Sequence, residues 1–241
     1  MNQSNSIGFS KHRLEALTDG IFAVVMTLLV IELKIPETFN GKTDAALLHH
    51  LAELSPRVIS WVVSFFVLAI FWISNHRQMH FVSVVDGTLV VLTMLFLALA
   101  SCMPFSSSLA GPYVMFHTSQ IVYGSNMFLM GVMSLLICRY IYRHPNLCIT
   151  PMPQATFQAA RFRTCGLLLV ALLSIAISYY WRGAGNTAFM LMIPIAFLAR
   201  RYEAKHIAQS GTTSNALLEP AAVEPKPTAT RPSNGRRKQR R

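Results

Sequence analysis

The sequence predicts an all-α integral membrane protein with six transmembrane helices in each chain. Of the 241 residues, 53% are hydrophobic and only 13% are charged, whereas soluble proteins carry roughly 25% charged residues. The apolar residues gather into long segments, and the basic residues fall mostly between these segments and at the C-terminus. This arrangement is typical of membrane topology and not of a nucleic-acid-binding surface, so nucleic acid is not an expected partner.

Six apolar segments support this fold class. They cover about 20–35, 58–75, 84–103, 119–138, 164–181 and 187–199. About 20 residues of helix cross the hydrocarbon core, and the second, third and fourth segments reach that length. The uninterrupted apolar run of the first, Gly20 to Ile31, is 12 residues long and by length alone could be a buried soluble helix. The fifth and sixth also read as short, and we expect them to form a tight hairpin.

The distribution of basic residues predicts that both termini are cytoplasmic. With the N-terminus inside, the loop over 105–118 faces out and contains no Lys or Arg, and Arg182 is the one unbalanced basic residue in an outer turn. This bias follows the positive-inside rule. The residues then placed inside are Lys11, Arg13, Arg77, Arg139, Arg143, Arg161 and Arg163.

These features divide the chain into a cytoplasmic N-terminus (1–12), a six-helix membrane domain (13–201) and a basic tail (202–241). The N-terminus has no apolar stretch of the kind found in removable signal peptides. A short amphipathic helix is expected outside the membrane over 43–54. The tail is too polar to bury a core, so we expect it to be disordered, and its final RRKQRR run would be attracted to anionic lipid.

No catalytic, cofactor or metal-binding motif is visible, so we expect neither an enzyme nor a bound cofactor. His76 and His80 have the i, i+4 spacing of metal ligands, but no third ligand is evident near them. The four cysteines lack any CxxC spacing and are expected to be free thiols. They are Cys102, Cys138, Cys148 and Cys165.

The entrance to the first apolar segment is the most informative part of the chain. Charged residues at 13, 15 and 19 lead directly into the apolar run, and charges at the end of a membrane helix usually have partners in a protein bundle or a water-filled path. Helical spacing places Val24, Leu28 and Ile31 on one stripe with Thr27 beside it. For a helix considered alone, core packing is the simpler explanation of such a stripe.

The entrance resembles a known family signature. RLEALTDG is similar to R-x-x-x-F-S-D-G, which marks the first helix of the transmembrane protein 175 family of potassium channels. Arg13, Asp19 and Gly20 match, whereas Leu17 replaces the Phe and Thr18 keeps the hydroxyl of the Ser.

Two further segments extend the resemblance, which covers about 13–200. FWISNHR is similar to the family's FW-x-x-H pattern, with Trp72 matched, Asn75 at the His position and His76 next to it. MPFSSSL is similar to the PF-(S/T) sequence after the third helix. Without an internal repeat, the chain resembles the bacterial members, which carry one six-helix unit.

The resemblance implies a potassium channel in the bacterial plasma membrane, assembled as a homotetramer with the first helix of each subunit lining the pore. Val24, Leu28 and Ile31 would form its apolar constriction, and Thr27 would offer a hydroxyl to a partly dehydrated K⁺ ion. Apolar constrictions gate by dewetting. Because no TVGYG carbonyl filter is present, we expect weak selectivity and leak-type conduction.

We also expect a polar network to hold the entrance of the pore helix in register. Its predicted members are Arg13, Thr18, Asp19, Trp72, Asn75 and His76. The alternative is that Arg13 only marks the inner side and Asp19 caps a helix.

Two other functions remain open. A proton-coupled secondary transporter would need an ionisable group near mid-membrane, and the segments offer only Asp86 and Glu32 near their ends. A membrane scaffold or an unusual membrane enzyme is the third possibility, with Arg13, Asp19 and His76 as the one candidate polar group.

Overall fold

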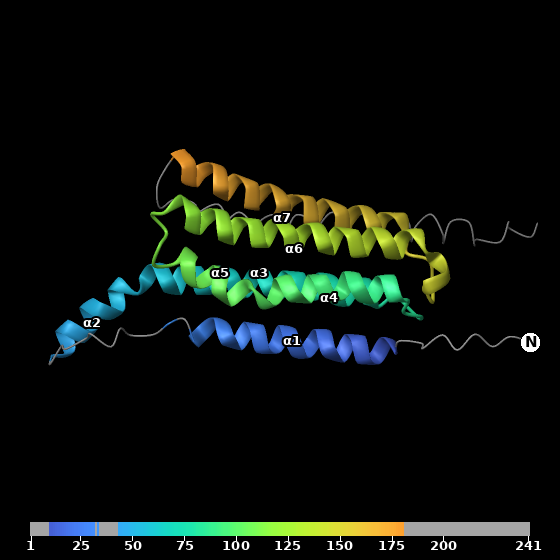
Figure 1. The fold of residues 1–241 in the computed structure, drawn as a ribbon, viewed down its shortest axis with the longest axis horizontal. Helices are drawn as coiled ribbons and strands as arrows, with labels where there is room; N and C mark the ends of the chain where they lie inside the picture. The colour runs from blue at the N-terminus through green and yellow to red at the C-terminus, as the bar shows by residue number, and fades with distance from the viewer. Residues whose placement is uncertain (1–9, 32, 34–42, 181–241) are drawn as a thin grey trace, which may run out of the picture.

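The computed structural model describes residues 10–31, 33 and 43–180, and it is a bundle of long, nearly parallel and antiparallel helices (Figure 1). In Figure 1, α1 runs along one edge of the bundle and α7 along the opposite edge, with α2 pointing away at one end. The elements are α1 (Lys11–Ile31), α2 (Asp44–Glu53), α3 (Ser55–Met79), α4 (Gly87–Ser101), α5 (Met103–Ala110), α6 (His117–Arg143), the short 3₁₀ helix η1 (Pro145–Leu147) and α7 (Gln154–Tyr180).

The all-α membrane fold class is confirmed. Within the described residues, five helical spans are long and apolar enough to cross a membrane: α1, α3, the α4–α5 pair, α6 and α7. Their lengths are 21, 25, 24, 27 and 27 residues. The predicted sixth segment (187–199) and the predicted tail (202–241) lie outside the described residues.

Several predicted boundaries are wrong. The first helix begins at Lys11 and so includes the charged entrance as well as the apolar segment, because its polar first turns stay exposed while Leu14 and Thr18 already pack inward. The fifth span is not short, since α7 begins at Gln154. Arg161 and Arg163 therefore lie in a helix and not in a loop. Long arginine side chains near a helix end can extend toward the membrane interface, so they do not prevent helix formation.

The third span has an interruption that the sequence analysis did not predict. The α4 helix ends at Ser101, and α5 begins at Met103 with Pro104 in its first turn, where a missing backbone N–H is tolerated. The helix then continues to Ala110, so the predicted outer loop 105–118 is helical over its first part, 105–110, and the non-helical connection is 111–116. A helix over the predicted range 43–54 is confirmed as α2, and the Thr43 hydroxyl accepts a hydrogen bond from Ala46 N at 3.3 Å.

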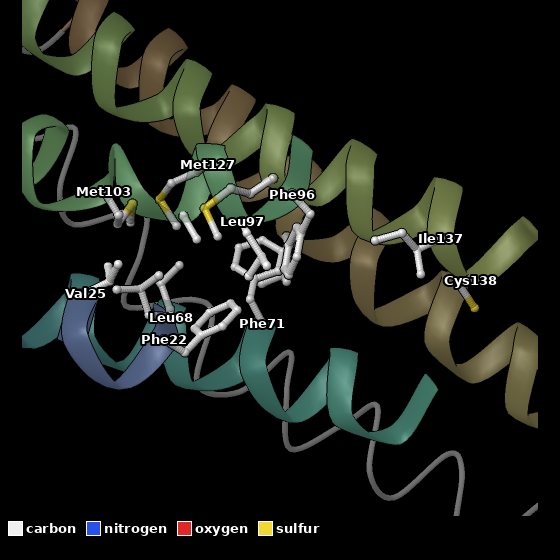
Figure 2. Packing of buried hydrophobic residues seen from close by; sticks show 14 of the residues in the cluster. Phe22, Val25, Leu68, Phe71, Phe96, Leu97, Met103, Met127, Ile137 and Cys138 are labelled. Carbon is white, nitrogen blue, oxygen red and sulfur yellow. The ribbon is translucent and has the colours of Figure 1, made fainter. Parts of the chain in front are cut away.

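Aromatic packing attaches α1 to the rest of the bundle (Figure 2). The Phe22 ring of α1 lies 5.8 Å from that of Phe96 on α4, and Phe96 lies 6.1 Å from Phe71 on α3. All three side chains are at most 1% exposed. Tilted and edge-on aromatic contacts of this kind are favourable beyond the area that they bury, so α1 has one firmly packed face.

Buried hydroxyls join α3, α5 and α6 inside the bundle. Ser64 donates to Ser107 Oγ at 2.8 Å, and the Tyr123 hydroxyl lies 2.8 Å from Ser64 Oγ. Farther along, Asn126 Nδ2 donates to Ser106 Oγ at 3.1 Å. Interhelical hydrogen bonds of this kind hold membrane helices together where lipid provides no hydrophobic drive.

At one end of the bundle, backbone hydrogen bonds join the α3–α4 connection to the α6–α7 connection. Ser83 N donates to Leu147 O at 2.7 Å, and Ile149 N donates to Phe81 O at 2.9 Å. Both connections lie at the end where α1 begins (Figure 1). The alternation of loops between the two ends agrees with the predicted topology, whereas the assignment of this end to the cytoplasm stays a prediction.

The α6–α7 pair packs closely through two glycines. A Cβ added at Gly124 would lie 2.7 Å from Ile175 Cγ1, and one added at Gly131 would lie 2.8 Å from Leu168 Cδ2. Real Cβ atoms essentially never come this close to a neighbour. The two helices therefore depend on small residues at their contact, as membrane helix pairs often do.

We predict that Gly124→Leu lowers the free energy of unfolding by about 1–3 kcal/mol, because it overpacks the α6–α7 contact. Thermal unfolding in detergent measures the change. The control is Gly87→Leu, because a Cβ at Gly87 meets nothing within 4 Å. Equal losses in both variants would contradict the importance of this close contact.

Candidate pore helix and its inner entrance

The α1 helix has one buried and one exposed face. Its buried residues recur every three or four positions and are Leu14, Thr18, Phe22, Val25 and Leu29. On the exposed side, Val24 is 56%, Leu28 is 41% and Ile31 is 49% accessible. The structure thus places the three predicted constriction residues together on the side of α1 that the bundle does not cover. Such an apolar face on a membrane helix contacts lipid, another subunit or a pore.

Thr27 is exposed beside this stripe, and its hydroxyl donates to Val24 O at 2.7 Å. The hydroxyl proton is therefore used inside the helix, while the oxygen lone pairs stay available as acceptors. A hydroxyl in this state can offer an oxygen to a cation but not a proton to an anion. Gly20 adds no bulk on the exposed side, and a Cβ there would meet nothing within 4 Å.

Two helices meet through polar side chains at the entrance. Trp72 Nε1 on α3 donates to Asp19 Oδ1 on α1 at 2.8 Å. The His76 ring stacks on Trp72 with a centroid distance of 5.9 Å and an interplanar angle of 28°. The structure thus brings Asp19, Trp72 and His76 together. Asp19 lies about two turns inside α1, which begins at Lys11, so the alternative that Asp19 caps a helix is wrong.

The other predicted members of the network are placed differently. Arg13 is exposed, and six residues of helix place it about 120° around the helix axis from Asp19 and about 9 Å along it, so the two side chains do not meet. The Thr18 hydroxyl turns inward and donates to Leu14 O at 2.9 Å. Asn75 is buried on α3, at 2% exposure.

A second polar group was not predicted from the sequence. Arg163 Nη2 on α7 donates to Ser74 Oγ on α3 at 2.9 Å, and Gln78 Nε2 lies 3.4 Å from the same oxygen. Arg163 directly precedes the fifth apolar segment, and this is the signal that could have found this group, since arginines within membrane helices almost always face the bundle interior. Its assignment to a loop hid that signal.

The opposite end of α1 borders a pocket of about 240 Å³. Its wall combines apolar side chains at and just beyond the end of α1 with polar groups of α3 and α5. The lining residues are Leu29, Leu33, Arg57, Trp61, Ser107, Ser108, Leu109, Gly111, Pro112 and Tyr113. The two ends of α1 therefore have different surroundings. The interhelical hydrogen bond lies toward its N-terminal end, and the pocket lies at its C-terminal end.

Metal and redox sites are not evident in the part of the chain that the structure describes. No three His, Cys, Asp or Glu side chains there come together in a way that could hold a metal ion. The four cysteines are free thiols, as predicted. Burial raises the pKa of the Cys148 thiol, which keeps it protonated at neutral pH.

We predict that Trp72→Phe lowers the free energy of unfolding by about 1 kcal/mol more than Trp61→Phe does. Trp72 loses a hydrogen bond between α1 and α3, whereas the buried Trp61 Nε1 has no acceptor to lose. Thermal unfolding of both variants in the same detergent measures the difference. Equal changes would show that the Asp19–Trp72 bond adds no stability.

The sequence matches to known proteins fall on the part of the chain that contains α1. Residues 13–104, from α1 into the start of α5, match the model of a family described as the endosomal/lysosomal potassium channel TMEM175. A potassium channel from Streptomyces collinus is 33% identical over 102 residues, which cover 42% of this chain and 48% of that protein. A potassium channel from Chamaesiphon minutus is 32% identical over 102 residues, covering 42% and 50%.

Animal relatives are less similar and are named proton channels. The endosomal/lysosomal proton channel TMEM175 of Gallus gallus is 28% identical over 109 residues, covering 43% of this chain and 22% of that protein. The chain thus spans about half the length of the two bacterial relatives and less of the animal one.

A solved structure shows the same fold. The crystal structure of a lysosomal potassium-selective channel TMEM175 homologue from Chamaesiphon minutus superposes with a TM-score of 0.65 at 23% identity, over 78% of this chain and 97% of that one. The long apolar helices and this shared fold make the chain an integral membrane protein, and the resemblance seen in its first helix extends over residues 13–104, which match the TMEM175 family model.

Proposed function

We propose that this chain forms a potassium-conducting cation channel as a homotetramer, with α1 of each subunit lining the pore. The bacterial relatives that match it are named potassium channels, and the family match includes all but the first two residues of α1. We place the channel in the bacterial plasma membrane with both termini in the cytoplasm. The proposal includes no cofactor, and K⁺ is the permeant ion.

One observation carries this proposal: α1 is packed on one side only. Phe22, Val25 and Leu29 are at most 3% exposed, whereas Val24 and Leu28 are 56% and 41% exposed. A constriction needs side chains held at a fixed distance from the pore axis, and a firmly packed rear face supplies this support. Four copies arranged around an axis would bring the exposed stripes together.

The physical chemistry of such a ring favours K⁺. Apolar side chains at a narrow neck hold water poorly, so an ion must shed part of its hydration shell to pass. K⁺ binds its hydration water less tightly than Na⁺ and so crosses with a smaller penalty. The oxygen of Thr27 would replace part of the lost hydration. Because one hydroxyl per subunit is a sparse substitute for a carbonyl filter, selectivity is weak and the channel is of the leak type.

The transporter alternative is less well supported. It requires a titratable group able to exchange protons near mid-membrane, and Asp86 is the candidate within the described residues. Asp86 is the N-cap of α4, where it accepts from Leu89 N at 3.0 Å and from the Tyr140 hydroxyl. This engagement favours a structural role for Asp86. Glu32, the other candidate, lies outside the described residues.

We predict that Val24→Ile raises the ratio of K⁺ to Na⁺ permeability by about threefold, a change of less than 1 kcal/mol in the relative barriers. The added methyl group narrows the neck and makes dehydration more costly for Na⁺. Leu28→Ala should widen the neck and lower the same ratio. Reversal potentials of the reconstituted protein in planar bilayers under K⁺/Na⁺ gradients measure both changes.

The control for these variants is Leu169→Ala, because Leu169 is 67% exposed on α7, at the opposite edge of the bundle from α1. It removes the same atoms from a surface that the proposal assigns to lipid. A ratio that is unchanged in Val24→Ile and Leu28→Ala would exclude this stripe as the neck. Ion flux absent from folded, oligomeric protein would contradict the channel itself.

A further inference from the structure

The α6 and α7 helices carry basic residues in a long stretch without acidic ones. Residues 87–202 contain no Asp or Glu, yet Arg139 and Arg143 lie near the end of α6, and Arg161 lies near the start of α7. These three side chains are exposed, and no ion pair joins any of them to a carboxylate in the part of the chain that the structure describes. The charge of this surface is therefore not balanced by the helices that carry it.

The packing of the two helices places two of these arginines at one level. The Tyr142 ring of α6 stacks on the Phe157 ring of α7 at 4.3 Å and 14°. Because the helices are antiparallel (Figure 1), one turn back along α6 reaches Arg139 and one turn forward along α7 reaches Arg161. Packed helices have axes about 8–10 Å apart, so the two guanidinium groups flank one seam.

Other nearby polar groups do not neutralise this pair. The closest acidic residue before the stretch, Asp86, already accepts from Leu89 N and the Tyr140 hydroxyl. Arg163, two residues farther along α7 and therefore on the other side of that helix, is half-buried and donates to Ser74, so it serves the bundle interior. Two like charges on adjacent helices repel one another, and a shared anion between them would turn this repulsion into attraction.

The position of the pair along the helices identifies the kind of anion. The α7 helix has 27 residues and is about 40 Å long, which exceeds the roughly 30 Å hydrocarbon core. Arg161 lies about 10 Å from its first residue, close to where the hydrocarbon core ends. The groups that a membrane offers at this depth are lipid phosphates. Three turns farther along the same face of α7, Leu172 is 51% exposed and offers an apolar surface to an acyl chain.

We propose that Arg139 and Arg161 together bind the phosphodiester of an anionic phospholipid at the inner end of the α6–α7 seam, with Arg143 at its rim. A guanidinium presents its N–H donors in a planar fork that fits phosphate oxygens, and one phosphate between the two arginines joins α6 to α7. This lipid site is separate from the α1 stripe and does not depend on the ion that the protein conducts.

The test is native mass spectrometry of the full chain in detergent with added phosphatidylglycerol or phosphatidylcholine of the same acyl chains. We expect phosphatidylglycerol to be retained preferentially. In Arg139→Gln/Arg161→Gln, we expect its affinity to fall about fivefold for each charge removed, or roughly 25-fold in all. The control is Lys11→Gln, which removes a cation from α1 at the same end of the bundle and should retain phosphatidylglycerol like the wild type.

Two further measurements keep the proposal falsifiable. If the double glutamine variant fails to fold, Arg139→Lys/Arg161→Lys keeps the charge but loses the fork, and its affinity should lie below that of the wild type. Excess inorganic phosphate should not displace the lipid, because it has no acyl chain to pack on α7. Equal binding of both lipids, an unchanged affinity in these variants or displacement by inorganic phosphate would each overturn the proposal.

Discussion

The attachment of α1 through one face is the constraint on which the rest of the structure depends. Helices in lipid gain little from the hydrophobic effect when they associate, so fitted side chains and interhelical hydrogen bonds must hold them. Phe22 supplies the fit by packing against Phe96, which in turn contacts Phe71. Trp72 adds a directional bond to Asp19. Packing thus sets how close α1 lies, and the hydrogen bond sets how it is turned, since a rotation by one residue, about 100°, would break that bond and bury part of the exposed stripe.

Much of this arrangement could be predicted from the sequence because α1 has a clean helical repeat. The spacing of Val24, Leu28 and Ile31 placed them on one stripe, and the structure leaves that stripe exposed. The network at the entrance was harder to predict. Its members were named correctly only in part, because a motif shows which residue types occur and not which way each side chain turns. Thr18 turns inward to Leu14 O, and Arg13 faces away from Asp19, a geometry that helical spacing alone could have revealed.

The errors elsewhere have one physical origin, which is that polar residues were taken as the ends of membrane helices. Arg161 and Arg163 were assigned to a loop, yet α7 extends past both of them to Gln154. The Arg161 side chain is exposed on the outside of the helix, and Arg163 donates to Ser74 inside the bundle. The buried hydroxyls of Ser64, Ser107 and Tyr123 could not be located from sequence either. The sequence pattern around a serine in an apolar helix is the same whether the serine faces lipid or a neighbouring helix. Only the packing of the helices determines which of the two it contacts.

Charge divides the bundle into two parts that are stabilised differently. On the α1 side, carboxylates are met by protein groups: Glu15 pairs with Lys11, and Asp19 accepts from Trp72. On the α6–α7 side, where residues 87–202 contain no acidic residue, the described structure pairs the exposed arginines with no carboxylate. A pore helix benefits from the first arrangement, because its orientation then depends on fixed partners inside the protein. A peripheral helix pair can have the second arrangement if the membrane around it balances its remaining charge, as the proposed lipid site requires. The two proposals thus place the pore at α1 and the contact with lipid phosphate at the opposite edge of the bundle.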